Sequence, residues 1–354
     1  MQTVRLMLAG LGFVNRGLLR LLMEKNHTIG RFHFKVTAIA DSSGVALNTS
    51  GFDSASILRL KETGGHVADL PEFSSGLRTT DFAGTGIGDV LSEATPASLV
   101  DGNPGLTAAR SALMAGAHVV FANKAPLVFA FDELHNLAVS ASPDSYFQEP
   151  GRSVGSGSRI AYSATVCGGL PVVNVIRRDL RGARITRIRG ILNATSNYVL
   201  DTLANGGEFQ EAVREAQRIG AAEADPSYDI NGNDTANKLF IIVKTIGGYN
   251  GSFLDTDLTG ISKVTAKQMA EAKARGCTIR LVATAERKEK SWQLRVAPEE
   301  VEETSFLGQC RGWEMGVELE SDWYERMWLK NSEREPTGTS AAVLRDILSV
   351  CEGE

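Results

Sequence analysis

The sequence predicts a two-domain protein in which an α/β domain with a doubly wound parallel sheet precedes an α+β domain. Three observations support this prediction. The first forty residues read as strand, glycine turn, helix and strand, and strands and helices then alternate as far as residue 124. A segment rich in Pro, Gly and Ser at 141–158 separates this pattern from a mixed one. A length of 354 residues is also that of about two domains.

The N-terminal unit begins with an apolar run at residues 4–10, which predicts a buried strand. The turn Gly10-Leu11-Gly12 follows, and apolar residues then recur at helical spacing from Val14 to Leu22. Residues 32–40 predict a second strand that ends at Asp41. This order describes a βαβ unit, whose two strands run parallel in one sheet.

Further elements continue the alternation. We expect a strand at 87–91, a helix at 106–115 that stops at Gly116, and a strand at 118–122 that leads into Lys124. The later half of the chain predicts strands at 185–192, 278–285 and 292–296 and helices at 209–219, 235–246, 266–274 and 339–350. Parallel strands joined by helices predict a sheet covered on both faces, and the mixed pattern predicts an α+β domain.

Composition excludes several classes of protein. With 37 Lys+Arg against 42 Asp+Glu the net charge is −5, which argues against a nucleic-acid or anionic-membrane partner reached by bulk electrostatics. The longest uncharged stretch, 160–176, contains Gly168, Gly169 and Pro171 and is too short and broken to span a bilayer. Four well-separated cysteines without zinc-site spacing predict a reduced, cytoplasmic protein.

The glycine turn indicates a dinucleotide site. A strand, a glycine-rich turn and a helix start place backbone N–H groups and the positive helix end against a pyrophosphate. Here Gly10 and Gly12 fit the pattern, Phe13 and Val14 open the helix, and Asn15 replaces the third glycine. An ordinary βα turn is the alternative. Asp41 ends the second strand, where a carboxylate binds a ribose diol and repels a 2′-phosphate, and this favours NAD over NADP. Alternatively, Asp41 only caps a turn.

Five blocks in the chain resemble homoserine dehydrogenases. They are Phe121-Ala-Asn-Lys124, Ala164-Thr-Val-Cys-Gly-Gly-Leu-Pro171, Gly190-Ile-Leu-Asn-Ala-Thr-Ser-Asn-Tyr198, Ala222-Glu-Ala-Asp-Pro-Ser-Tyr-Asp-Ile-Asn-Gly-Asn-Asp234 and Lys238. The resemblance implies a Rossmann domain at 1–145, an α+β domain for substrate binding and dimerisation at 160–305, and a C-terminal segment, 306–354, that returns to the first domain. It also implies a homodimer, and the chain stops too early to carry the regulatory domain of some family members.

The resemblance also implies an activity, the NAD(P)-dependent interconversion of L-homoserine and L-aspartate 4-semialdehyde, which belongs to threonine and methionine biosynthesis. Lys238 would be the acid/base, and Asp234, four residues before it on the same helix face, would bind and orient the substrate. Burial lowers the pKa of a lysine and a nearby carboxylate raises it, so such a pair suits proton exchange. The alternative is a structural ion pair. Lys124 would stand between nicotinamide and substrate, and Thr95 would contact the cofactor.

The acidic loop before the helix of Lys238 would bind the amino acid. By resemblance Glu223 and Asp229 would hold the α-ammonium group and Thr195 would line the same pocket, whereas a solvated acidic loop is the alternative. Ala194, where the family has glycine, adds a methyl group at this pocket. This change keeps open another small hydroxy or amino acid as substrate.

Three further positions depart from the family. Ser163 replaces a glutamate that helps to bind a monovalent cation, so a cation at the carbonyl groups of Val166, Gly168 and Leu170 is doubtful. Cys167 replaces a glycine in the same segment and is expected to be a small buried residue rather than a reactive thiol. Bulky, charged Glu333-Arg334-Glu335 replaces a glycine-rich segment that meets the cofactor. This keeps open a catalytically silent nucleotide-binding homologue.

Overall fold

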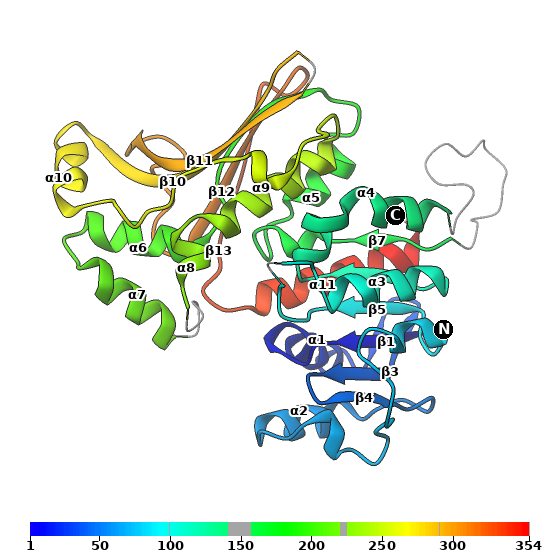
Figure 1. Ribbon diagram of the computed structural model, residues 1–354. Helices are drawn as coiled ribbons and strands as arrows, with labels where there is room; N and C mark the ends of the chain where they lie inside the picture. The colour runs from blue at the N-terminus through cyan, green and yellow to red at the C-terminus, as the bar shows by residue number, and fades with distance from the viewer. Residues whose placement is uncertain (99, 141–156, 220–224, 290, 354) are drawn as a thin grey trace. The chain divides into compact units, whose positions relative to one another are not determined.

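The computed structural model describes residues 1–98, 100–140, 157–219, 225–289 and 291–353. The chain forms two compact units (Figure 1). Met1–Thr165 and Pro336–Glu354 make the first unit, and Val166–Glu335 makes the second. The expected return of all of 306–354 to the first domain is therefore wrong for 306–335. Those residues carry two strands whose backbone groups pair in the second sheet.

The first unit contains a seven-stranded sheet with the order β2-β3-β1-β5-β6-β7, and β4 pairs with β3. Its strands are β1 (Gln2–Ala9), β2 (Thr28–Ile29), β3 (Phe32–Asp41), β4 (Gly44–Leu47), β5 (Val90–Glu93), β6 (His118–Phe121) and β7 (Ile160–Ala161). The pairs β3–β1, β1–β5, β5–β6 and β6–β7 are parallel, whereas β2 and β4 run antiparallel to β3. The sheet is doubly wound, and the strand order reverses between β1 and β5, the point where such sheets bind ligands.

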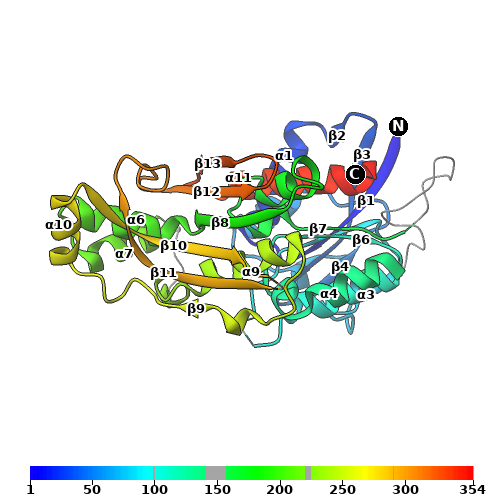
Figure 2. The ribbon, with the colours of Figure 1, turned by 90° about the horizontal axis from the view of Figure 1, so that it is seen from above.

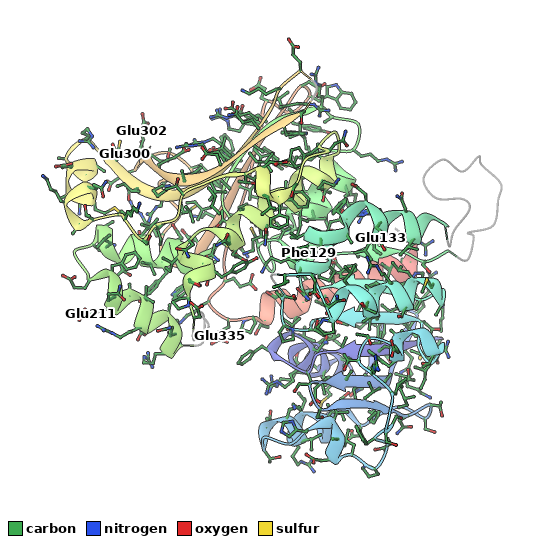
Figure 3. All side chains as sticks on the ribbon, in the orientation of Figure 1. Phe129, Glu133, Glu211, Glu300, Glu302 and Glu335 are labelled. Atoms are coloured by element: carbon green, nitrogen blue, oxygen red, sulfur yellow. The ribbon has the colours of Figure 1, made fainter. Side chains whose placement is uncertain are left out.

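Helices cover both faces of this sheet. They are α1 (Phe13–Glu24), α2 (Ser54–Glu62), α3 (Gly105–Met114), α4 (Ala125–Ser140) and α11 (Thr337–Glu352). Helices α1 and α11 lie on one face, and α3 and α4 lie on the other (Figure 2). Glu133 of α4, labelled in Figure 3, pairs with Arg110 of α3 at 2.6 Å. The crossover helices thus join the parallel strands as predicted.

Helix α11 completes the core of the first unit. Its buried residues Ala342, Val343, Ile347 and Val350 pack in one cluster with Leu18, Leu19 and Leu22 of α1 and with residues of β1 and β3. At Gly17 an added Cβ would collide with the side chain of Ser340, whose hydroxyl donates to the carbonyl of Val14 at 3.0 Å. Glycine at position 17 therefore allows the close approach of α1 to α11.

The second unit contains a six-stranded sheet with the order β13-β12-β8-β10-β11-β9 (Figure 2). Its strands are β8 (Ile185–Ile191), β9 (Asp257–Leu258), β10 (Cys277–Arg287), β11 (Trp292–Glu302), β12 (Glu314–Ser321) and β13 (Arg326–Ser332). All neighbours are antiparallel except β9, which runs parallel to β11. The hairpin of β12 and β13 is absent from our prediction and extends the sheet beyond β8.

The helices of the second unit include α5 (Val172–Asn174), α6 (Ala194–Ala204), α7 (Phe209–Arg218), α8 (Ser227–Ile230), α9 (Asn233–Ile246) and α10 (Ala266–Ala274). Helix α9 packs against β10 and β11, and α6 packs against β10. Arg275, after α10, pairs with Glu300 of β11 at 2.6 Å, and Figure 3 labels Glu300. In the part of the chain that the structure describes, no helix is long and apolar enough to cross a membrane.

Candidate active site

Two turns of the first unit meet where the strand order reverses. Gly10 follows β1 and has φ +80°, and an added Cβ would collide with the backbone of Ala94 and Thr95, which follow β5. Only glycine allows this contact. The structure therefore brings Gly10 together with Thr95 at the carboxyl ends of neighbouring parallel strands, where doubly wound sheets bind ligands.

The second glycine of the turn has no such packing role. An added Cβ at Gly12 would meet no protein atom within 4 Å, and Gly12 is the N-cap of α1. The space beside it suits a group that approaches the helix N-terminus closely, as a pyrophosphate does. Phe13 and Val14 form the first turn of α1; Phe13 is 67% exposed, and the guanidinium of Arg16 lies 5.1 Å from its ring centroid.

Asn15 shows why the third glycine is dispensable. Its fully buried amide donates to the carbonyl groups of Ala9 and Gly10 at 3.1 and 2.8 Å, and its Oδ1 accepts from the hydroxyl of Ser92 at 2.7 Å. The asparagine thus fixes the glycine turn to β1 and β5 by hydrogen bonds. This is a substitute for the close packing that glycine provides.

Asp41 is engaged within the protein. Its Oδ1 accepts from the backbone N–H of Ser43 at 2.8 Å and from the Ser43 hydroxyl at 2.5 Å. Its Oδ2 accepts from Lys61 Nζ at 2.9 Å and from the N–H of Val67 at 3.2 Å. These donors hold the pKa of Asp41 below its ordinary value, although desolvation opposes them. Sequence reasoning missed Lys61, whose charge lies beside that of Asp41.

Lys124 lies between β6 and α4. It is half-buried, and its carbonyl accepts from the N–H groups of Leu127 and Val128 in the first turn of α4. Asn123, directly before it, donates from Nδ2 to Thr95 Oγ1 at 3.4 Å and accepts at Oδ1 from the N–H of Ala125 at 2.9 Å. The turn that carries Lys124 is therefore connected to Thr95.

Lys238 and Asp234 form a buried ion pair in the second unit. The ammonium group lies 2.7 Å from Asp234 Oδ2, and the two side chains are 12% and 6% exposed. Lys238 also donates to the carbonyl of Leu192 at 2.8 Å. Both residues lie on one face of α9, as the spacing of four predicts. A buried lysine beside a carboxylate is an arrangement suited to proton exchange.

Asn193 joins the acidic residues of this site and was missed by the sequence reasoning. Its Nδ2 donates to Asp229 Oδ1 at 2.8 Å and to Asp234 Oδ2 at 2.7 Å. Its Oδ1 accepts from the N–H of Ser196 at 2.7 Å and so caps α6. An asparagine just before a helix is a signal for an N-cap, but no local signal shows its contact with the two aspartates.

The other residues predicted to bind the substrate lie close to this network along the chain, except for one that the structure does not describe. Thr195 is buried in the first turn of α6, two residues after Asn193, and Ala194 begins that helix. Tyr228 of α8 accepts a hydrogen bond from Asn237 of α9, and burial together with the charge of Asp234 raises the pKa of Tyr228. Glu223 lies outside the described residues.

Ser163, where the sequence predicts a doubtful cation site, is hydrogen-bonded to Asp346. Its N–H and its hydroxyl donate to the two carboxylate oxygens of Asp346 in α11, at 2.7 and 2.9 Å, and Arg345 donates to Ser163 Oγ at 2.6 Å. Both Ser163 and Asp346 are almost fully buried. Among the described residues no cluster of three or more His, Cys, Asp or Glu could hold a metal ion.

The segment after Ser163 forms a tight turn in the second unit. Cys167 and Gly168 both have φ +56°, and Leu170 donates to the Cys167 carbonyl at 3.0 Å. Cys167 is fully buried, which raises the pKa of its thiol to about 12 and makes it a poor nucleophile, as expected. Glu333 accepts from the N–H of Gly169 at 2.7 Å, and an added Cβ at Gly168 would collide with its carboxylate.

Known proteins match this chain over almost its whole length. The family model of homoserine dehydrogenase matches residues 171–348. The homoserine dehydrogenase of Methanocaldococcus jannaschii is 31% identical over 348 residues, with 98% of each chain covered. The NAD(+)-dependent homoserine dehydrogenase of Pseudomonas canavaninivorans is 30% identical and covers 99% of this chain and 97% of its own length.

Solved structures agree with these relatives. A putative homoserine dehydrogenase from Archaeoglobus fulgidus has a TM-score of 0.83 at 31% identity, covering 98% of this chain and 99% of that chain. A homoserine dehydrogenase from Thermoplasma acidophilum has a TM-score of 0.82 at 28% identity, covering 99% and 100%. Together with the matching family model and with relatives similar along the whole chain, they show that this protein belongs to the homoserine dehydrogenase family.

Proposed function

We propose that this protein is an NAD(P)-dependent homoserine dehydrogenase that interconverts L-homoserine and L-aspartate 4-semialdehyde. Family membership supports this reaction. The observation that carries the proposal is the network of Lys238, Asp234, Asn193 and Asp229 in the second unit. It combines a buried lysine for proton transfer with carboxylates that suit an α-ammonium group.

Lys238 is the residue that moves the proton. In homoserine oxidation its neutral amine accepts the hydroxyl proton, and in the reverse direction its ammonium group donates a proton to the carbonyl oxygen. Asp234 and the Leu192 carbonyl fix the position of Nζ. A bound nicotinamide cofactor would supply the hydride chemistry that accompanies this proton transfer.

Asp229 and Glu223 bind the substrate ammonium group, and Thr195 contributes to the same pocket. Asn193 supports this role because its amide holds Asp229 Oδ1 and Asp234 Oδ2 at 2.8 and 2.7 Å. One amide between two carboxylates keeps both acceptors fixed before the substrate arrives. The added methyl group of Ala194 is the reason to include other small hydroxy amino acids in the substrate panel.

The first unit holds the nicotinamide nucleotide. The open space at Gly12 and the N-terminus of α1 would hold the pyrophosphate, beside Phe13 and Val14 at the helix start. Thr95 and Lys124 would hold the nicotinamide end. NAD(H) is the preferred cofactor because Asp41 stays ionised at the end of β3. The preference is narrow, since Lys61 lies 2.9 Å from this carboxylate and offsets its repulsion of a 2′-phosphate.

The protein acts as a homodimer in the reduced cytoplasm and needs no monovalent cation. The four cysteines form no disulfide in the structure, which suits a reducing compartment. Exposed Trp323, Tyr324 and Trp328 on the hairpin of β12 and β13 support a partner surface on the second unit. Light scattering of the purified protein tests the dimer.

The decisive experiment measures oxidation of NADH and NADPH with aspartate 4-semialdehyde, and their formation from homoserine and a panel of small hydroxy amino acids. We expect turnover with homoserine and a modest preference for NAD(H). Folded protein that binds a nucleotide without turning over any substrate would instead identify a catalytically silent homologue. Turnover of a different hydroxy acid alone would assign another dehydrogenase.

A further inference from the structure

Glu93 carries a fully buried carboxyl group at the carboxyl end of β5. The group lies against Gly105, the first residue of α3, where an added Cβ would be 2.6 Å from Oε1 and 2.8 Å from Oε2. No side chain larger than hydrogen fits at position 105 while the carboxyl group stays in place. Residues of β5 and α3 therefore together form the buried space that holds this carboxyl group.

Oε1 of Glu93 determines how Thr95 presents its hydroxyl group. It accepts from the N–H of Thr95 at 2.9 Å and also from the Thr95 hydroxyl. Because the single hydroxyl hydrogen is donated to Glu93, Oγ1 of Thr95 is left as an acceptor toward every other neighbour. Asn123 Nδ2, at 3.4 Å, is one such donor. The carboxamide N–H of nicotinamide is an amide donor like Asn123 Nδ2, so Thr95 Oγ1 suits it as an acceptor.

Glu93 also connects to the turn of Lys124. Its backbone carbonyl accepts from the N–H groups of Ala122 and Asn123 at 2.8 and 3.3 Å. Asn123 then joins Thr95 Oγ1 on one side and the N–H of Ala125, at the start of α4, on the other. One residue thus fixes, directly or through Asn123, the two turns that follow β5 and β6.

Neighbouring charges do not explain this burial. Desolvation raises the pKa of Glu93 to about 7, and only Thr95 and Asn123 oppose it. Within the described residues Oε2 has no hydrogen-bond partner. Ionisable groups on the elements packed against β5 interact with residues other than Glu93. Arg5 of β1 pairs with Asp89, and His118 of β6 accepts from the N–H of Arg159. Arg110 of α3 pairs with Glu133, and Asp346 of α11 accepts from Ser163. A further ionisable residue, Lys124, directly follows Asn123 in the turn between β6 and α4.

We propose that Glu93 is a positioning residue for the nicotinamide end of the cofactor, which it holds in place by fixing Thr95 as a hydrogen-bond acceptor and, through Asn123, the turn of Lys124. This inference rests on the proposed function, because it takes Thr95 and Lys124 as cofactor contacts. A protonated and an ionised Glu93 bind the two Thr95 donors with different strength, so the position of Thr95 depends on pH around neutrality.

Two variants test the proposal from opposite sides. Glu93→Gln keeps the shape of the side chain and its acceptor for Thr95 but removes the ionisation, whereas Gly105→Ala keeps the carboxyl group and displaces it. Glu62→Gln, at the end of α2, is the matched control because the side chains of Glu62 and of its partner Arg20 are both exposed. NADH affinity is measured by fluorescence from pH 5.5 to 9 without amino-acid substrate, followed by kcat and KM for homoserine.

We expect both variants to lose kcat by about 10- to 100-fold, the usual effect of a misplaced reacting group, while KM for homoserine stays close to that of the wild type. NADH affinity should change with pH near neutrality in the wild type and in Glu62→Gln, but not in Glu93→Gln. If Glu93→Gln matches the wild type in kcat and in NADH affinity at every pH, the proposal is overturned. Because NADH binding needs no substrate, it remains a test of Glu93 even if homoserine is not turned over.

Discussion

The ammonium group of Lys238 lies 2.7 Å from the carboxylate of Asp234 and 2.8 Å from the carbonyl oxygen of Leu192. Two acceptors from two segments therefore fix one donor at a single position in the second unit. A surface i,i+4 ion pair has no such second acceptor and contributes little to stability. This arrangement favours a catalytic lysine held in place by its neighbours.

Replacing Lys238 should abolish most of the activity. We expect Lys238→Ala to lower kcat by about 10²–10⁴-fold, the usual contribution of a positioned acid/base, with little change in NAD(H) affinity because the residues proposed to bind the nucleotide lie in the other unit. Stopped-flow turnover and NADH fluorescence measure the two effects. Lys267→Ala, at an exposed position of α10, is the control. A fully active Lys238→Ala variant would reduce the pair to a structural contact.

Asp41 and Lys61 should set the cofactor preference in opposite directions. Asp41→Ala removes the carboxylate that neutralises the ammonium group of Lys61, so NADP should bind more tightly and NAD more weakly. Lys61→Met leaves the carboxylate without its cation, so NADP should bind more weakly. We expect each shift to be about three- to tenfold, as for roughly 1 kcal/mol of charge interaction. Dissociation constants for both cofactors, measured at one ionic strength, would contradict this if the two variants moved the ratio in the same direction.

Glu93 should make the protein less stable as pH rises. Its pKa is about 7 in the folded protein and close to 4.5 when it is exposed. The folded state therefore binds more protons between these values, and the stability present at low pH is lost as pH rises through 7. Glu93→Gln lacks this loss and should gain up to about 3 kcal/mol relative to the wild type between pH 4 and 8. Urea denaturation at several pH values measures the difference, and parallel curves would contradict the shift.

Cys167 should be inert toward thiol reagents. It is fully buried, and burial raises the pKa of its thiol to about 12, so the thiolate population near neutral pH is negligible. Cys277 is partly exposed and should react first. Titration of the native protein with a chromogenic disulfide, followed by peptide mapping, should leave Cys167 unmodified. Rapid labelling of Cys167 in folded protein would disprove its assignment as a packing residue.

The sequence predicted the elements whose periodicity is strong. The helix expected at 266–274 has the same bounds in the structure, and the strand expected at 32–40 differs by one residue. Strand β13 escaped prediction because exposed residues such as Arg326 and Lys330 alternate with half-buried ones along the strand. Such a segment looks like a loop until its partner strand is known.

The features of the candidate site also fall into those that the sequence could predict and those that it could not. The spacing of Asp234 and Lys238 is local and could be predicted from the helix period. The pairs Asp41–Lys61, Asn193–Asp229 and Ser163–Asp346 could not, because their members lie 20, 36 and 183 residues apart along the chain. Burial and these long-range hydrogen bonds, rather than local propensity, decide which polar residues act together.

Exchange of sodium for a large organic cation at fixed ionic strength should leave kcat and KM unchanged. Ser163 stands where the family has a cation-binding glutamate, and in the structure this serine forms hydrogen bonds within the protein. Its N–H and hydroxyl both donate to Asp346 and so connect the segment after β7 to α11 within the first unit. In the neighbouring segment, the carbonyl of Leu170 already accepts from the N–H of Val172 at 2.9 Å, which leaves fewer neutral oxygens for an ion.

Variants at position 163 sharpen this prediction. Ser163→Glu would place a second carboxylate in the fully buried space beside Asp346, so it should lower the thermal midpoint rather than create cation dependence. Ser163→Ala removes only the hydroxyl bonds and should cost about 1 kcal/mol, again without cation dependence. Activity that falls severalfold in the organic cation and returns with sodium would show that carbonyl groups alone hold an ion. In that case the substituted serine would be irrelevant to the cation, and the ion-free assignment would be wrong.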